Sequence, residues 1–131
     1  MTQLAKALWN RATEALAAAK HVLQVSPNAA ASRAYYAAFY AVSAALALQR
    51  KSYRKHSAVE AAVHRDFVKA GLWPKEIGQA YSGLLELRTL GDYGEVGNVK
   101  PENAKLAIDA AELIVKAVAR TYPADFRLDK E

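Results

Sequence analysis

Three side chains that could act on an anionic ligand lie together in the stretch LELRTLGDYGE, residues 85–95. Arg88 precedes Asp92 by four positions, which is about one helical turn, and Tyr93 follows directly. In the simplest interpretation this pair is an ordinary helix ion pair that contributes about 0.3 kcal/mol. However, the negative end of a helix dipole disfavours an acid in the last turn by roughly 0.3–1 kcal/mol. Helix stability alone does not explain Asp92, and the alternative is a site in which Arg88 binds an anion.

A second arginine, Arg33, lies in the most apolar stretch of the chain, SRAYYAAFYAVSAAL. Its guanidinium must reach solvent or find a partner, so one interpretation is a surface-reaching or salt-bridged side chain. The other is an anion site, because the planar fork of donors matches phosphate geometry. The aromatic residues beside Arg33 are more simply core than a platform for nucleobases. Of these, Tyr36 is included among the candidate residues for binding RNA or nucleotide.

A basic run extends over residues 50–56 and is most simply a solvated loop. In the alternative interpretation, Arg54 and Lys55 contact phosphates, and Tyr53 stacks on a base, which would make binding strongly dependent on salt. The run ends at His56, which is a candidate proton donor or acceptor because histidine titrates near neutral pH.

Metal and cofactor sites are not predicted. His56, Glu60 and His64 share a helical spacing of four, but two histidines and one carboxylate are a weak basis for a metal site. The chain has no cysteine and neither of the glycine-rich patterns GxxxxGK[ST] and GxGxxG that hold nucleotide phosphates.

Composition indicates one compact domain with an anionic partner. The 131 residues are 53% hydrophobic and 24% charged, which excludes a disordered chain, and the formal net charge is +5. A basic balance favours nucleic acid, a nucleotide or an acidic protein as the partner. Ser32, Arg33 and Ser43 interrupt the most apolar segment, and the first residues lack a signal-peptide pattern, so we expect a cytoplasmic protein without a membrane partner.

Helical periodicity dominates the chain. We predict an all-α, up-and-down bundle of about five helices within residues 1–122, followed by a loose tail at 123–131. The expected helices cover residues 3–24 and 27 to about 50, then run from the cap at Ser57 toward Gly71, from Pro74 toward the break at Gly91, and onward from Pro101.

Local signals support several of these boundaries. Ser26 is expected to cap the second helix, with Pro27 at its first position, where a missing N–H costs nothing. Ser57 and Glu60 fit a capping box at the start of the third helix. Three glycines between residues 91 and 97 predict the end of the fourth helix and a flexible connection.

Three blocks, SRAYYAAFYAVSAAL, KHSAVEAAVHRDFVKAG and LLELRTLGDYG, in this order and spacing resemble the small stand-alone prokaryotic HEPN domains (higher eukaryotes and prokaryotes nucleotide-binding). The resemblance covers roughly residues 3–120. It implies a bundle of four or five helices that commonly dimerises. Many HEPN domains are metal-independent ribonucleases, and others are noncatalytic binding modules. Small members are often encoded beside a minimal nucleotidyltransferase, the pair behaving as toxin and antitoxin.

The nuclease members carry an arginine followed after four to six residues by a histidine, and Arg88 matches that arginine. The histidine is absent, because the window after Arg88 holds Tyr93, Gly94 and Glu95. Tyrosine, with a pKa near 10, is a poor base compared with histidine, whose pKa is near 6.5. The branch of the family that this chain resembles has R and then DY here, with SRAYYA upstream. The resemblance therefore implies that Asp92 and Tyr93 belong to a shared signature.

The sequence thus predicts a HEPN homodimer that binds RNA or nucleotide in a cleft lined by Arg33, Arg88, Asp92 and Tyr93, and that works with a nucleotidyltransferase. In related systems the partner modifies a tyrosine close to the nuclease motif, which makes Tyr93 a candidate target. One alternative is an active ribonuclease toxin that uses Arg88, with His56 in place of the missing histidine. The other is a noncatalytic helical adaptor.

Overall fold

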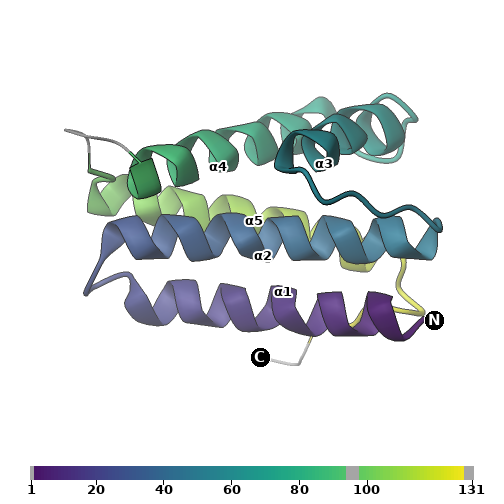
Figure 1. Ribbon diagram of the computed structural model, residues 1–131, viewed down its shortest axis with the longest axis horizontal. Coiled ribbons are helices and arrows are strands. Elements are labelled where there is room, and N and C mark those ends of the chain that lie inside the picture. The colour runs from purple at the N-terminus through teal and green to yellow at the C-terminus, as the bar shows by residue number, and fades with distance from the viewer. Residues whose placement is uncertain (1, 94–97, 129–131) are drawn as a thin grey trace.

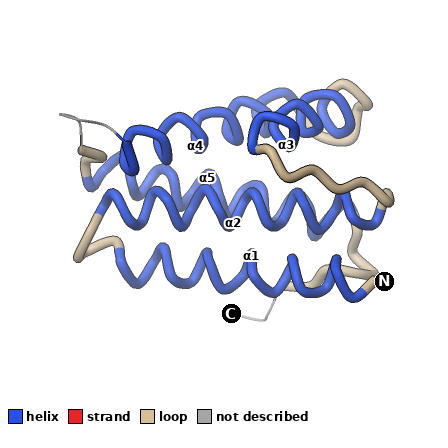
Figure 2. The backbone as a smooth tube through the Cα atoms, in the orientation of Figure 1, coloured by secondary structure: helices blue, strands red, loops and turns tan. Residues whose placement is uncertain are grey.

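The computed structural model describes residues 2–93 and 98–128, and the side chain of Tyr93 lies outside this description. Residues 2–93 and 98–128 form no strand (Figure 2). The prediction of an all-α bundle of about five helices is therefore confirmed. The helices are α1 (Gln3–Val22), α2 (Pro27–Leu48), α3 (His56–Ala62), the π-helical segment η1 (Val63–Val68) that continues α3, α4 (Lys75–Tyr93) and α5 (Pro101–Thr121).

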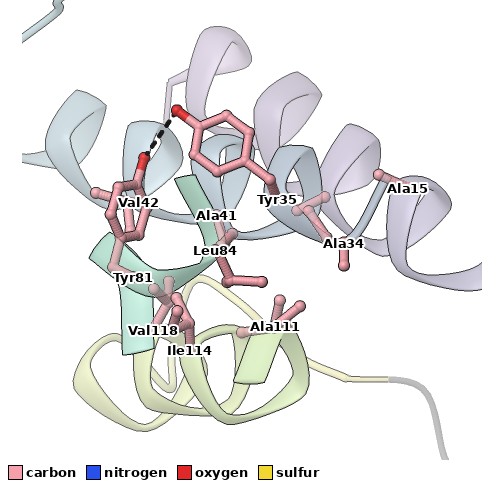
Figure 3. Packing of buried hydrophobic residues seen from close by; sticks show 14 of the residues in the cluster. Ala15, Ala34, Tyr35, Ala41, Val42, Tyr81, Leu84, Ala111, Ile114 and Val118 are labelled. Atoms are coloured by element: carbon pink, nitrogen blue, oxygen red, sulfur yellow. Dashed lines mark hydrogen bonds between the residues drawn. The ribbon is translucent and has the colours of Figure 1, made fainter. Parts of the chain in front are cut away.

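Helix α2 is central, and it packs against α1, α3, α4 and α5. Figure 1 shows α1 and α2 running antiparallel along most of their length, with α4 on the other side of α2. Much of α2 is fully buried alanine, and such small side chains let neighbouring backbones approach closely. The core also contains two buried tyrosines, Tyr35 of α2 and Tyr81 of α4, whose hydroxyl groups meet (Figure 3).

The start of α2 matches the prediction, whereas the start of α3 does not. Ser26 Oγ accepts a hydrogen bond of 3.1 Å from the Ala29 N–H, and Pro27 is the first helical residue. In contrast, α3 begins at His56, one residue before the predicted capping serine, and its N-cap makes no side-chain hydrogen bond. The predicted capping box is wrong because the Glu60 carboxylate accepts from Ser82 Oγ of α4 at 2.6 Å, a tertiary bond.

Helix α4 extends beyond the predicted break at Gly91 and ends at Tyr93. Gly91 is helical, and a Cβ atom there would lie 3.3 Å from the backbone oxygen of Asn28. The glycine thus permits a close approach between α4 and the start of α2. Gly94 and Gly97, which were expected in the flexible connection, lie outside the described residues.

The segment after α5 differs from the expected loose tail as far as residue 128. Phe126 is buried, and its ring stacks on Trp9 of α1 with 4.8 Å between ring centroids. The Trp9 indole N–H donates to the backbone oxygen of Arg127 at 3.1 Å. This expectation needs correction because apolar burial fixes the segment to α1. Residues 129–131 lie outside the description.

Candidate functional site

The Arg88 side chain is held in a fixed position between α2 and α4. Its Nη2 donates to the Tyr36 hydroxyl at 3.0 Å, and its Nε lies 3.0 Å from Asp92 Oδ2. Only 14% of the Arg88 side chain is exposed, compared with 28% of the Asp92 side chain. The expected ion pair is therefore present, and it orients a largely buried guanidinium. This contact gives Asp92 a role at the unfavourable end of the helix dipole.

Two arginines share the ring of Tyr36. The Arg88 guanidinium carbon lies 5.5 Å from the ring centroid, and that of Arg33 lies 5.1 Å from it. Both distances are in the range of cation–π attraction, which is strongest where the cation is partly desolvated. Arg33 is half-buried, so it reaches the molecular surface from the apolar helix α2. Two positive charges on one aromatic ring are an arrangement that an anion would stabilise.

His56, the first residue of α3, lies beside Arg88 and the aromatic side chains of α2. Its Nδ1 is 2.7 Å from the Tyr35 hydroxyl, and its ring centroid is 4.9 Å from that of Phe39. Partial burial, together with the positive charge of Arg88, lowers the pKa of His56 below its ordinary value. The neutral ring is therefore favoured at pH 7.

The hydroxyl groups of Tyr35 and Tyr81 determine which ring nitrogen of His56 carries the proton. Tyr81 donates to Tyr35 at 3.5 Å, and burial raises the pKa of Tyr35 to about 12, so Tyr35 keeps its proton. The arrangement that satisfies this chain has Tyr35 donating to His56 Nδ1, an assignment made from the hydrogen-bond network. The neutral ring then carries its proton on Nε2, as a hydrogen-bond donor.

The sequence model of the HEPN domain family matches residues 5–121. A relative from Thermotoga maritima, named UPF0332 protein, is 43% identical over 111 residues, which are 84% of each chain. The chain belongs to the HEPN domain family. In this HEPN domain, tertiary structure places His56 of α3 and Arg88 of α4 at the same tyrosine ring, that of Tyr36, although 32 positions separate them in the sequence.

Five of the predicted residues of this HEPN domain form one contiguous group, which we call the Arg88 cluster: Arg33, Tyr36, His56, Arg88 and Asp92. The other predicted residues are placed differently. Arg54 and Lys55 are exposed, and Arg54 lines another hollow with Tyr53. Within the described part of the chain, the side chains of these two residues make no hydrogen bond or ion pair with the Arg88 cluster, although Lys55 directly precedes His56. The side chain of Tyr93 is outside the description.

The sequence alone did not assign a site role to the tyrosines behind His56. Tyr35 was expected to belong to the core in preference to a nucleobase platform, yet its hydroxyl contacts the histidine. A buried tyrosine usually finds a partner for its hydroxyl, so a tyrosine in an apolar helix was a usable signal. The identity of that partner could not be predicted, because it comes from a different helix.

The three residues with metal-like spacing have separate roles. His56 contacts Tyr35, whereas His64 Nε2 and Glu60 both contact the Ser82 hydroxyl, at 3.0 and 2.6 Å. Over residues 2–93 and 98–128, no three His, Cys, Asp or Glu side chains are grouped as metal ligands would be. Over the same residues, no helix has both the length and the apolar content that crossing a membrane requires.

Proposed function

We propose that this HEPN protein binds phosphate groups of RNA or of a nucleotide at the Arg88 cluster. The observation that carries the proposal is the fixed position of Arg88 between the Tyr36 hydroxyl and the Asp92 carboxylate. An arginine that is already ordered loses little side-chain entropy when a ligand arrives, which favours binding. Arg33 adds a second guanidinium at the same tyrosine ring, and the net charge of +5 favours the approach of an anion.

The experiment measures binding of fluorescently labelled oligouridine RNA by anisotropy at low salt. We expect Arg88→Gln to weaken binding about 10- to 100-fold, because hydrogen bonds to charged groups contribute about 1.5–3 kcal/mol. The matched control is Arg120→Gln, which removes an exposed arginine near the end of α5. A large loss of thermal stability in Arg88→Gln with unchanged RNA affinity would contradict the proposal. Absence of any binding by the wild-type protein would favour the helical adaptor.

We also propose that the protein is a cytoplasmic homodimer that works with a minimal nucleotidyltransferase as a toxin–antitoxin pair, with Tyr93 as the modified residue. The support is membership of the HEPN family and the arrangement expected for its small stand-alone members. Expression with and without the neighbouring gene, scored for growth arrest and copurification, tests the partnership. Mass spectrometry of the copurified protein and of Tyr93→Phe tests the modification.

A second candidate function, metal-independent RNA cleavage, is favoured by the position of His56 and Arg88 at the same Tyr36 ring, with 5.8 Å between the ring centroids of His56 and Tyr36 and 5.5 Å between that of Tyr36 and the Arg88 guanidinium carbon. Asp92 would accept the proton of the 2′-hydroxyl as the 2′-oxygen bonds to phosphorus. The bond from phosphorus to the 5′-oxygen would break, and His56 in its protonated form, which is the minor form at pH 7, would give its Nε2 proton to that oxygen and become neutral. Arg88 would stabilise the charge on the phosphate.

Incubation of RNA with the purified protein in EDTA distinguishes this candidate from binding alone. Cleavage that is lost in both Arg88→Ala and His56→Ala would establish the ribonuclease. Intact RNA, together with binding by the wild-type protein, would leave the noncatalytic function.

A further inference from the structure

A strip of alternating arginine and tyrosine side chains continues from the Arg88 cluster along α2. The rings of Tyr36 and Tyr40 lie one helical turn apart, with 5.8 Å between their centroids. Arg11 of α1 places its guanidinium carbon 5.9 Å from the Tyr40 ring centroid. Three helices therefore each supply one guanidinium to this strip. Arg88 of α4 and Arg33 of α2 lie over the Tyr36 ring, and Arg11 of α1 lies over the Tyr40 ring.

The far end of this strip is a surface hollow of about 320 Å³, which we call the Arg11 hollow. Its lining includes Arg11, Arg33 and Tyr40. Ala15 and Ala18 of α1 also line it, and their small side chains occupy little of the space. Among the described residues, no carboxylate forms an ion pair within 4.0 Å of Arg11 or Arg33. Arg33 belongs to both places, because it lines the hollow and also stacks on Tyr36 beside Arg88. The two sites thus form one continuous surface.

We infer that the Arg11 hollow is a second phosphate site and that the ligand is single-stranded RNA, which spans both sites, instead of a free mononucleotide. This inference rests on the proposed function of the Arg88 cluster. The seven positions from Arg33 to Tyr40 cover about 10 Å of helix at about 1.5 Å per residue. An RNA strand presents successive phosphates and can contact guanidinium groups spread along this length. The single phosphate of a mononucleotide can contact only the guanidinium groups at one end of the strip.

The chemistry of the strip favours a single strand over a duplex. Single-stranded RNA is recognised through bases that stack on aromatic rings or on arginine planes, and both kinds of surface alternate here. Glu14 also lines the Arg11 hollow, and its carboxylate would repel a phosphate placed against it. We therefore place the phosphate beside Arg11 and Arg33. A ribose hydroxyl or a base amino group, each a hydrogen-bond donor, then faces Glu14.

The test compares two probes, uridine 5′-monophosphate and a labelled uridine hexamer, on the full-length protein. We expect Arg11→Gln to weaken hexamer binding about 5- to 10-fold and to reduce the salt dependence of binding by about 0.7 in log–log slope, the value for one phosphate contact on a single strand. Binding of the mononucleotide should stay unchanged. Arg88→Gln should weaken both probes, and the control Arg120→Gln should affect neither. The same titrations with a thymidine DNA hexamer and with an RNA duplex test whether the protein prefers single-stranded RNA.

The outcomes separate this inference from the proposed function. If the wild-type protein binds both probes and Arg11→Gln leaves hexamer affinity unchanged, the Arg11 hollow is not a phosphate site, while the Arg88 proposal stands. Preference for the duplex over the single strand would also overturn the inference. If the wild-type protein binds neither probe, the proposed function itself fails.

Discussion

At the residue scale, the Tyr36 hydroxyl is the group that fixes Arg88 from the neighbouring helix, through a bond of 3.0 Å. Tyr36→Phe keeps the ring on which both arginines lie and removes only this bond. We expect RNA affinity to fall about 2- to 10-fold, because one hydrogen bond contributes about 0.5–1.5 kcal/mol. Anisotropy titration with the labelled RNA measures the change.

The control for this substitution is Tyr122→Phe, which removes a hydroxyl that accepts from Gln49 Nε2 at 2.8 Å. It should leave RNA affinity unchanged. Equal losses of affinity in the two variants would show that the Tyr36 hydroxyl has no special part in positioning Arg88.

The pKa of His56 provides a second prediction at this scale. Burial and the charge of Arg88 lower it in the folded protein, whereas the unfolded chain has a value near 6.5. Below about pH 6.5 the unfolded chain therefore binds a proton that the folded protein does not. The stabilising contribution of neutral His56 is complete above that pH and is lost as the pH falls toward the lower, folded pKa.

We expect Arg88→Gln to raise the pKa of His56 part of the way toward 6.5, since burial remains. A titration of the His56 ring protons by NMR measures this, and Arg120→Gln serves as the unchanged control. A His56 pKa at or above 6.5 in the wild-type protein would contradict the structural account.

At the scale of elements, α4 packs on η1 through a glycine. A Cβ atom at Gly78 would lie 2.8 Å from the ring of His64 and 3.2 Å from Val68 Cγ2. The His64 ring is held by its 3.0 Å contact with Ser82 Oγ, so it cannot turn away without losing that bond. Gly83, on the same helix, has no atom within 4 Å of the equivalent position.

The two glycines form a matched pair for a stability measurement. Gly83→Ala should raise the free energy of unfolding by about 0.5–1 kcal/mol, the helix propensity difference. Gly78→Ala should be less stable than Gly83→Ala by about 1–2 kcal/mol, because overpacking or a lost hydrogen bond offsets that gain. Urea unfolding followed by circular dichroism measures both free energies of unfolding. Equal values would show that the side chains of η1 move away from the added methyl group without an energetic cost.

At the scale of the whole molecule, the C-terminal segment fastens to the N-terminal helix. Phe126 is 1% exposed, and it stacks on Trp9, which is 117 positions earlier in the sequence. Phe126→Ala should lower the free energy of unfolding by about 3 kcal/mol, in the range for truncating a buried aromatic side chain.

The control for Phe126→Ala is Leu72→Ala, at a leucine that is 54% exposed, and it should change the free energy of unfolding by less than about 0.5 kcal/mol. Thermal and urea unfolding give both values. A loss in Phe126→Ala no larger than in the Leu72 variant would mean that this segment contributes little to the fold.

Local sequence patterns predicted most of the helices and, within the site, the ion pair between Arg88 and Asp92. The cap at Ser26 and the spacing of Arg88 and Asp92 depend on residues three or four positions apart, which a helix brings together by its own geometry. The capping box at Ser57 failed for the opposite reason, because the Glu60 carboxylate had a stronger partner in α4.

The sequence by itself determined the helices, the basic charge and the family signature, because these depend on residue type and short spacing. Only the tertiary structure decided that Tyr36 would hold Arg88, that His56 would lie beside it, and that Arg11 of α1 would extend the arginine strip. Each of these contacts joins different helices. Their positions depend on how the small and large side chains of α2 pack against α1, α3 and α4, and no pattern within a single helix contains that information.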